Sequence, residues 1–65
     1  MPEPVYEQLS LWLDPNERME SSHGNVTKKE WAYKEAARLQ AHGRLAEVRY
    51  DILGKVALFV EGRKR

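Results

Sequence analysis

Residues 27–43 carry the signals for both ends of a single helix, and this feature constrains the fold most. Thr27-Lys28-Lys29-Glu30 is a capping box, in which the Thr27 hydroxyl accepts a hydrogen bond from the Glu30 amide and the Glu30 carboxylate reaches back. Gly43 can take the left-handed conformation that ends a helix. The face that we expect to pack on a sheet repeats every three or four residues and comprises Ala32, Ala36 and Leu39.

The segment that follows predicts a β-hairpin with a three-residue loop. Asp51 opens a type I turn, and Gly54 takes the positive-φ bulge position. This register places three apolar pairs on one face: Tyr50 with Val56, Val48 with Leu58, and Ala46 with Val60. The other face pairs Asp51 with Lys55, Arg49 with Ala57, and Glu47 with Phe59. A two-residue loop at Leu53-Gly54 would mix the faces, so the patterned register is expected.

Residues 5–13 have a period-two pattern, which indicates a strand or an extended peptide. Its apolar members, interrupted by Glu7, are Val5, Leu9, Leu11 and Leu13. Because a two-stranded hairpin with one helix is scarcely a domain, a third strand here would complete a β-α-β-β layer. We therefore expect one small α+β domain with three parts: residues 1–13 as an extended arm or edge strand, 14–25 as a linker, and 26–65 as a helix-plus-hairpin module.

Length and composition exclude several classes of protein. Sixty-five residues allow one small domain, and the absence of cysteine excludes disulfides and thiolate metal sites. No segment approaches the roughly 18 apolar residues of a membrane span, and the acidic start lacks the features of a signal peptide. His23 and His42 have no partners at metal or catalytic spacing. We therefore expect a cytoplasmic, non-enzymatic protein without a cofactor or metal.

Charge is divided unevenly along the chain. Residues 1–25 carry one basic residue against five acidic ones, a net charge of −4, whereas residues 26–65 carry ten against five, a net charge of +5. A basic body can bind phosphate, although a solvated helix face is the more ordinary explanation. The candidate nucleic-acid-binding residues are Lys28, Lys29, Lys34, Arg38, Arg63, Lys64 and Arg65.

The sharpest functional motif is Gln8-Leu9-Ser10-Leu11-Trp12. It resembles the peptide that bacterial replication and repair proteins insert into the DNA sliding clamp, whose usual form is Gln-Leu-Ser/Asp-Leu-Phe, with tryptophan here in place of phenylalanine. The resemblance covers five or six residues of the chain. It implies that Gln8 bonds at the pocket rim, Leu9 lies along the groove and Ser10 faces solvent. Leu11 and Trp12 would be the buried anchors, with further contact from Leu13.

The expected function is accordingly a small bacterial or phage interaction module that docks on the sliding clamp and recruits or inhibits replication factors. The alternative is a small basic nucleic-acid-binding or regulatory protein whose residues 5–13 are a structural strand with Leu9, Leu11 and Leu13 in the core. A further possibility involves Phe59, which falls on the face away from the helix. That face could inhibit another protein, form a homodimer or be covered by the arm.

Overall fold

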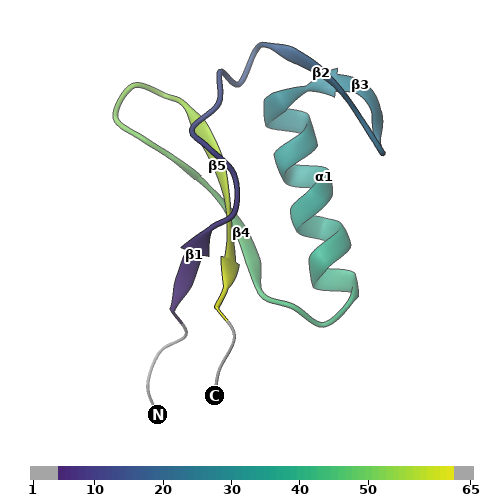
Figure 1. The fold of residues 1–65 in the computed structure, drawn as a ribbon, viewed down its shortest axis with the longest axis vertical. Coiled ribbons are helices and arrows are strands. Elements are labelled where there is room, and N and C mark those ends of the chain that lie inside the picture. The colour runs from purple at the N-terminus through teal and green to yellow at the C-terminus, as the bar shows by residue number, and fades with distance from the viewer. Residues whose placement is uncertain (1–4, 63–65) are drawn as a thin grey trace.

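The computed structural model describes residues 5–62 as an α+β fold with one helix and two antiparallel sheets (Figure 1). The larger sheet has the strand order β1-β5-β4, and β2 pairs with β3 in the smaller one. The fold class expected from the sequence is confirmed. No helix in this described part of the chain is long and apolar enough to cross a membrane. The elements are β1 (Tyr6–Gln8), β2 (Arg18–Ser21), β3 (Gly24–Thr27), α1 (Lys28–Ala41), β4 (Ala46–Tyr50) and β5 (Val56–Glu61).

Helix α1 begins and ends where its local chemistry predicts. The Thr27 hydroxyl accepts a hydrogen bond from the Glu30 amide at 3.1 Å, while the Glu30 carboxylate lies 3.9 Å from the Lys34 ammonium group. At the other end, Gly43 adopts a φ of +82° and its amide bonds to the Gln40 carbonyl at 3.0 Å. These contacts satisfy backbone groups at the two ends and so fix where the helix begins and where it ends.

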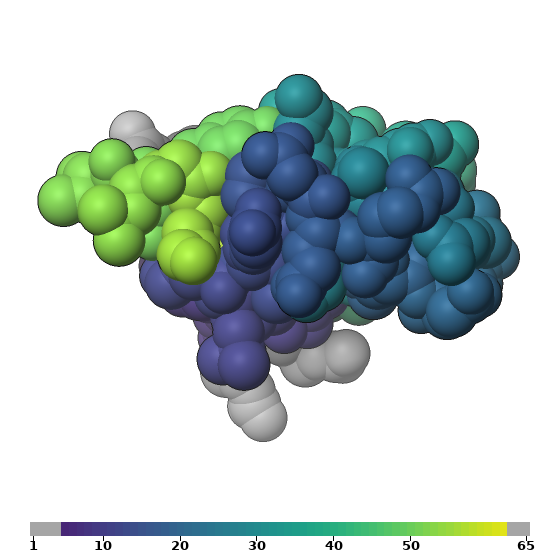
Figure 2. All heavy atoms as spheres, turned by 90° about the horizontal axis from the view of Figure 1, so that it is seen from above, coloured from purple at the N-terminus to yellow at the C-terminus, as the bar shows by residue number. Residues whose placement is uncertain are grey.

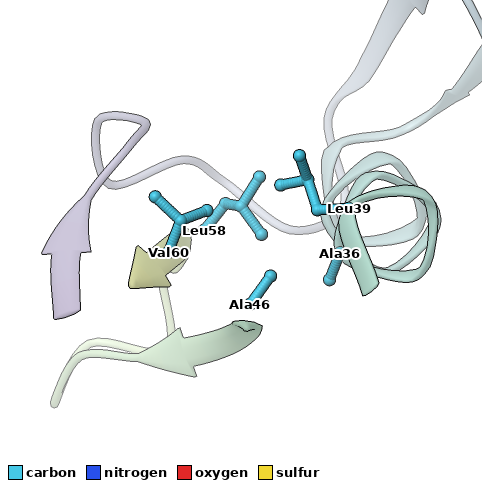
Figure 3. Close-up of a cluster of buried hydrophobic side chains, with 5 residues drawn as sticks. All are labelled: Ala36, Leu39, Ala46, Leu58 and Val60. Atoms are coloured by element: carbon cyan, nitrogen blue, oxygen red, sulfur yellow. The ribbon is translucent and has the colours of Figure 1, made fainter. Parts of the chain in front are cut away.

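The core lies between α1 and the strands β4 and β5 (Figure 3). The three helix positions expected to face the sheet are all buried, as are Val56 and Leu58. Burying a leucine side chain such as Leu58 contributes about 1.5–3 kcal/mol, a large share of the stability of so small a domain. The main cluster, against which Trp31 and Val48 also pack, comprises Ala36, Leu39, Ala46, Leu58 and Val60.

The β4–β5 hairpin has the predicted register in all five strand pairs, from Ala46 opposite Val60 to Tyr50 opposite Val56. The Asp51 side chain accepts hydrogen bonds from the amides of Leu53 and Lys55, and Gly54 adopts a φ of +83°. These contacts all lie within the turn, so they favour this register through local chemistry. The turn projects from one side of the molecule in Figure 2.

The expectation that residues 14–25 are a linker is wrong, because β2 and β3 form a hairpin across most of that segment. Met19 lies opposite Val26, and the buried Val26 side chain anchors this hairpin to the rest of the fold. The module boundary at residue 26 fails for the same reason, since β3 runs through it into α1. A turn at residues 14–16 precedes this hairpin, with the Asp14 carboxylate accepting a hydrogen bond from the Asn16 amide at 3.0 Å.

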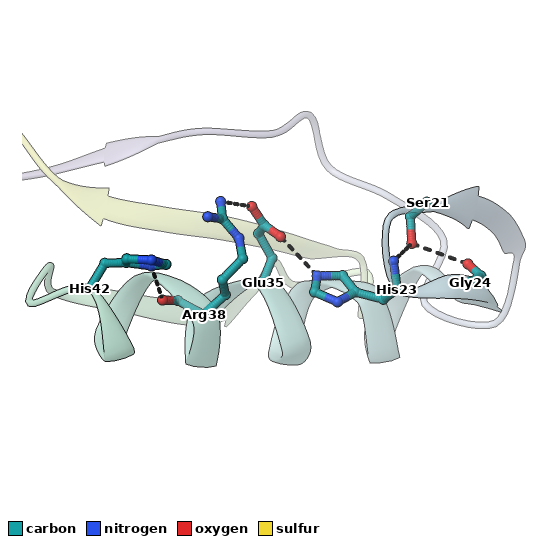
Figure 4. Close-up of polar contacts among 6 residues, drawn as sticks. All are labelled: Ser21, His23, Gly24, Glu35, Arg38 and His42. Carbon is teal, nitrogen blue, oxygen red and sulfur yellow. Dashed lines mark hydrogen bonds and ion pairs between the residues drawn. The ribbon is translucent and has the colours of Figure 1, made fainter.

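A polar contact attaches the β2–β3 hairpin to the helix (Figure 4). The His23 ring nitrogen Nε2 lies 2.9 Å from Glu35 Oε1, and the Arg38 guanidinium donates to the other Glu35 oxygen. The hydrogen bond from Arg38, followed by that with His23, lowers the pKa of Glu35 from 4.5 to about 2. Glu35 therefore stays ionised well below the pH at which a free carboxyl group would gain a proton.

Candidate protein-binding site

The segment resembling a clamp-binding peptide lies along an outer edge of the larger sheet. Strand β1 pairs antiparallel with β5, placing Tyr6 opposite Glu61 and Gln8 opposite Phe59. The backbone ladder continues with the Leu9 amide bonded to the Leu58 carbonyl at 2.7 Å. The third strand that the period-two pattern suggested is therefore present, although β1 itself spans three residues.

A bulge interrupts this edge immediately after Leu9. The next backbone bonds join Leu13 to Val56, at 2.8 Å in each direction. Between these two pairs the N-terminal segment contributes residues 10–12, whereas β5 contributes Ala57 alone. A regular antiparallel ladder would place one residue opposite one. Residues 10–12, called the bulge below, therefore contain two extra residues that leave the plane of the sheet.

Two polar side chains of the motif hold the bulge in shape. The Ser10 hydroxyl accepts a hydrogen bond from the Leu58 amide at 3.1 Å, the place that a backbone carbonyl would occupy in a regular ladder. The Gln8 side-chain amide donates to the Ser10 carbonyl at 2.7 Å. Ser10 is half-buried in this arrangement, whereas the resemblance to a bound clamp peptide implied that it faces solvent.

Trp12 lies on the outer face of the sheet, the face turned away from α1. Its ring centroid is 5.8 Å from that of Phe59, with the planes tilted by 54°. The guanidinium of Arg49 lies 4.6 Å from the Phe59 centroid and 5.1 Å from that of Tyr6, within cation–π range. The N-terminal segment thus covers the Phe59 face, one of the outcomes expected from the sequence.

The sequence alone did not predict that Tyr6 and Arg49 would lie in one cluster with Trp12 and Phe59. The hairpin register does place Arg49 and Phe59 on one face, so their contact could have been found from the pattern. The position of Tyr6 depends on the β1–β5 register, for which neighbouring residues give no signal.

The leucines of the motif are mostly outside the core. Leu11 is 80% exposed and Leu9 is 56% exposed, whereas Leu13 is half-buried beside Val56. The expectation that a structural strand would bury all three is wrong, because the bulge breaks the period-two alternation after Leu9. Trp12 is 38% exposed, so three apolar side chains of the motif, Leu9, Leu11 and Trp12, are accessible to solvent.

The basic candidates have a different environment. Lys28 pairs with Glu17, Lys34 with Glu30, and Arg38 with Glu35. These carboxylates offset the positive charge that the helix could present to a phosphate. Lys29 is exposed on the first turn of α1. The remaining candidates, Arg63, Lys64 and Arg65, lie outside the described residues.

Residues 5–62 contain no group of three or more His, Asp or Glu side chains placed to hold a metal ion. The chain matches no known family model, no curated protein and no solved structure. Function is therefore inferred from residues 8–13 and from the surfaces around them.

Proposed function

We propose that this protein is a non-enzymatic interaction module of a bacterium or phage that docks on the DNA sliding clamp in the cytoplasm. The contact residues are those of the motif: Gln8, Leu9, Leu11, Trp12 and Leu13. The observation that carries the proposal is the exposure of Leu11, at 80%, in a bulge that the sheet edge holds outward. Docking there would recruit replication factors to the clamp or exclude them from it.

The energetics of the exposed segment suit insertion into an apolar pocket. Leu11 loses little intramolecular packing when it docks, and burying a leucine contributes about 1.5–3 kcal/mol. Trp12 has to give up its ring contact with Phe59, a contact worth about 0.5–1.5 kcal/mol beyond its buried area. A pocket that encloses the indole more fully than Phe59 does would outweigh that loss.

The bulge also lowers the cost of ordering the peptide. Backbone hydrogen bonds anchor it at Leu9 on one side and at Leu13 on the other. A segment held at both ends has fewer conformations to lose on binding than a free arm has. Release of the hydrogen bond between Ser10 and Leu58 and of the ring contact between Trp12 and Phe59 would let residues 10–12 move outward while β1 stays paired.

Titration of the full chain with a purified bacterial sliding clamp by calorimetry tests the proposal. Wild-type protein should bind, and the double variant Leu11→Ala, Trp12→Ala should lose detectable binding, because anchor residues each contribute about 2 kcal/mol or more. Leu53→Ala is the matched control, since Leu53 is 77% exposed in the β4–β5 turn and lies outside the motif. It should bind like the wild type.

Circular dichroism of each variant should show the wild-type fold, because Leu11, Trp12 and Leu53 all lie outside the buried core. Absence of wild-type binding at high micromolar clamp would overturn the proposal. So would a loss of affinity in Leu53→Ala equal to that of the double variant.

The alternative function, nucleic-acid binding by a protein whose residues 5–13 are structural, has one observation in its favour: β1 is hydrogen-bonded into the sheet. The ion pairs on Lys28, Lys34 and Arg38 count against it. A filter-binding assay with duplex DNA at low salt separates the two proposals. DNA retained at low salt would favour the alternative if its affinity falls as salt is added. The expected slope of log affinity against log salt is about −0.9 per neutralised phosphate.

A further inference from the structure

The second edge of the larger sheet, strand β4, presents unpaired backbone groups. The Asp51 amide bonds to the Lys55 carbonyl, and the Glu61 amide bonds to the Leu45 carbonyl. Because such bonds alternate along an antiparallel pair, the odd-numbered residues from 45 to 51 face β5. The residues that point their amide and carbonyl groups away from β5 are therefore Ala46, Val48 and Tyr50. The Ala46 carbonyl has this orientation, because it accepts a hydrogen bond from the Gln40 side chain, outside the sheet, at 2.8 Å.

This edge has little of the usual protection against strand addition. Natural edge strands carry charged side chains, especially lysine, or carry proline or a bulge, or are covered by another element. The two charges of β4, Glu47 and Arg49, have opposite signs and pair with each other. Strand β4 has neither proline nor lysine, pairs with β5 without interruption, and is the last strand of its sheet within residues 5–62. Gln40 covers one carbonyl, and a carbonyl oxygen can accept a second hydrogen bond.

We propose that β4 pairs antiparallel with β4 of a second copy of this chain, with Val48 on the twofold axis. In this register the outward-facing residues meet as hydrogen-bonded pairs: Val48 opposite Val48, and Ala46 opposite Tyr50 of the second copy. The two three-stranded sheets then become one six-stranded antiparallel sheet. Both copies of α1 lie on the same face of it.

Charge complementarity selects this register. Glu47 and Arg49 lie on the outer face of β4, and the twofold places each Glu47 directly opposite Arg49 of the other copy. Opposite charges in such positions are stabilising, whereas like charges are destabilising. Sliding the pairing by two residues in one direction sets Arg49 opposite Arg49, and in the other direction sets Glu47 opposite Glu47.

The exposed apolar residues near β4 support the same pairing. Leu45 precedes the strand, Ile52 and Leu53 follow it, and all three are exposed. An antiparallel twofold brings the start of one β4 beside the end of the other, so Leu45 of one copy approaches Ile52 and Leu53 of the second. Apolar surface at both ends of the strand would thereby be removed from water.

The side of α1 nearest β4 is suited to packing against α1 of the second copy. This side is identified by the bonds from Gln40 to Ala46 and between the Tyr33 and Tyr50 hydroxyls, and Ala37 lies between Gln40 and Tyr33 by helical spacing. These three residues are uncharged, whereas Lys29, Glu30, Lys34 and Arg38 are the exposed charges on the helix. Since α1 contacts both β4 and β5, a strand spacing of about 4.8 Å places the two helices about 10 Å apart, a normal packing distance.

Sedimentation of the full chain over a range of concentrations tests the proposal. Wild-type protein should have the mass of two chains at high concentration and of one chain on dilution. Glu47→Arg alone sets Arg opposite Arg49, and Arg49→Glu alone sets Glu opposite Glu47, so each variant should associate roughly tenfold more weakly or not at all. An equimolar mixture of the two variants should restore the dimer, because every pair across the axis is again of opposite charge.

The mixture separates the interface from effects within one chain, since the Glu47–Arg49 pair of each chain stays broken in it. Amide hydrogen exchange gives a residue-level readout: the Val48 and Tyr50 amides should exchange more slowly in the dimer. The Leu11→Ala, Trp12→Ala variant should still dimerise, so this test is independent of clamp binding. A monomer at all concentrations, a dimer that persists in both single variants, a mixture that stays monomeric or a dimer lost in the arm variant would each overturn the proposal.

Discussion

The two edges of the larger sheet differ in what they present to solvent. Along β1 the ladder is interrupted, and the bulge of residues 10–12 turns side chains outward. Along β4 the ladder is continuous, and the strand presents its backbone. One sheet of three strands therefore offers a side-chain surface at one edge and a hydrogen-bonding template at the other, which suit different kinds of partner.

The Ser10 side chain contributes to this difference. Ser10 supplies a hydroxyl oxygen to the Leu58 amide, so β5 keeps its hydrogen bond although the N-terminal segment has left the ladder. Strand β4 contains no serine, threonine or asparagine that could act in this way. Its alternation of apolar and charged residues keeps every position in register.

Leu58→Ala should have the largest effect, because Leu58 connects the two edges: its side chain is fully buried and its amide bonds to Ser10. We expect a loss of about 2–5 kcal/mol in the free energy of unfolding, enough to disorder both edges at once. Urea unfolding followed by far-UV circular dichroism and by tryptophan fluorescence measures this. Fluorescence reports Trp12 and Trp31 together, so amide exchange at Leu9, whose amide bonds to Leu58, reports the β1 edge separately. If the Leu9 amide lost protection while the hairpin stayed folded, the two edges would be independent.

Gly54→Val should act on the β4 edge. Gly54 has a φ of +83°, and a Cβ there would meet no atom within 4 Å, so the cost comes from the backbone. A β-branched residue in this conformation should lose about 1–3 kcal/mol, whereas Gly54→Asn should lose much less because asparagine tolerates it. Thermal unfolding of both variants beside the wild type is the measurement. Equal melting temperatures for valine and asparagine would contradict the role given to this turn.

Ser10→Ala should act on the β1 edge alone. It removes the acceptor of the Leu58 amide and should cost about 1 kcal/mol. Amide exchange at Leu58 should become faster, because its amide no longer has an acceptor. Ser10→Thr keeps the hydroxyl and serves as the control. Unchanged exchange at Leu58 in the alanine variant would show that the bulge does not depend on this bond.

Glu35 belongs to neither edge and should give the smallest effect, because its partner Arg38 is largely solvated and such pairs are worth at most about 1 kcal/mol. Its folded pKa of about 2 lies below the ordinary carboxyl pKa of 4.5, so the unfolded chain binds a proton first as the pH falls. The stabilisation is complete above pH 4.5 and is lost as the pH falls toward about 2. Urea midpoints measured across this window should fall more steeply for the wild type than for Glu35→Gln. Parallel curves would contradict the assigned pKa.

Local chemistry explains which parts of the fold could be predicted from the sequence. The ends of α1 depend on Thr27 and Gly43, and the hairpin register depends on Asp51 and Gly54. Each of these residues acts on neighbours within a few positions. The β2–β3 hairpin was missed because its apolar content is limited to Met19 opposite Val26, a signal too short to distinguish from a loop.

The candidate site was only partly predictable for the same reason. Its residues were found from the motif, but their geometry depends on contacts between segments almost fifty positions apart, such as Ser10 with Leu58. The pairing of Lys28 with Glu17 likewise crosses the unexpected hairpin. A period of two predicts alternate burial only while the hydrogen-bond ladder is regular. The sequence of residues 5–13 does not indicate where the bulge interrupts that ladder.

The ends of the described chain meet, since the Gly62 amide donates to the Val5 carbonyl at 2.7 Å. A short linker could therefore join them, and new termini could be opened in the exposed turn at residues 52–53. Such a circular permutant would make β4 and β5 the terminal strands and β1 an internal one. The motif would then be internal to the chain. The hydrogen bonds between β1 and β5 would join segments that are close together in the sequence instead of about fifty residues apart.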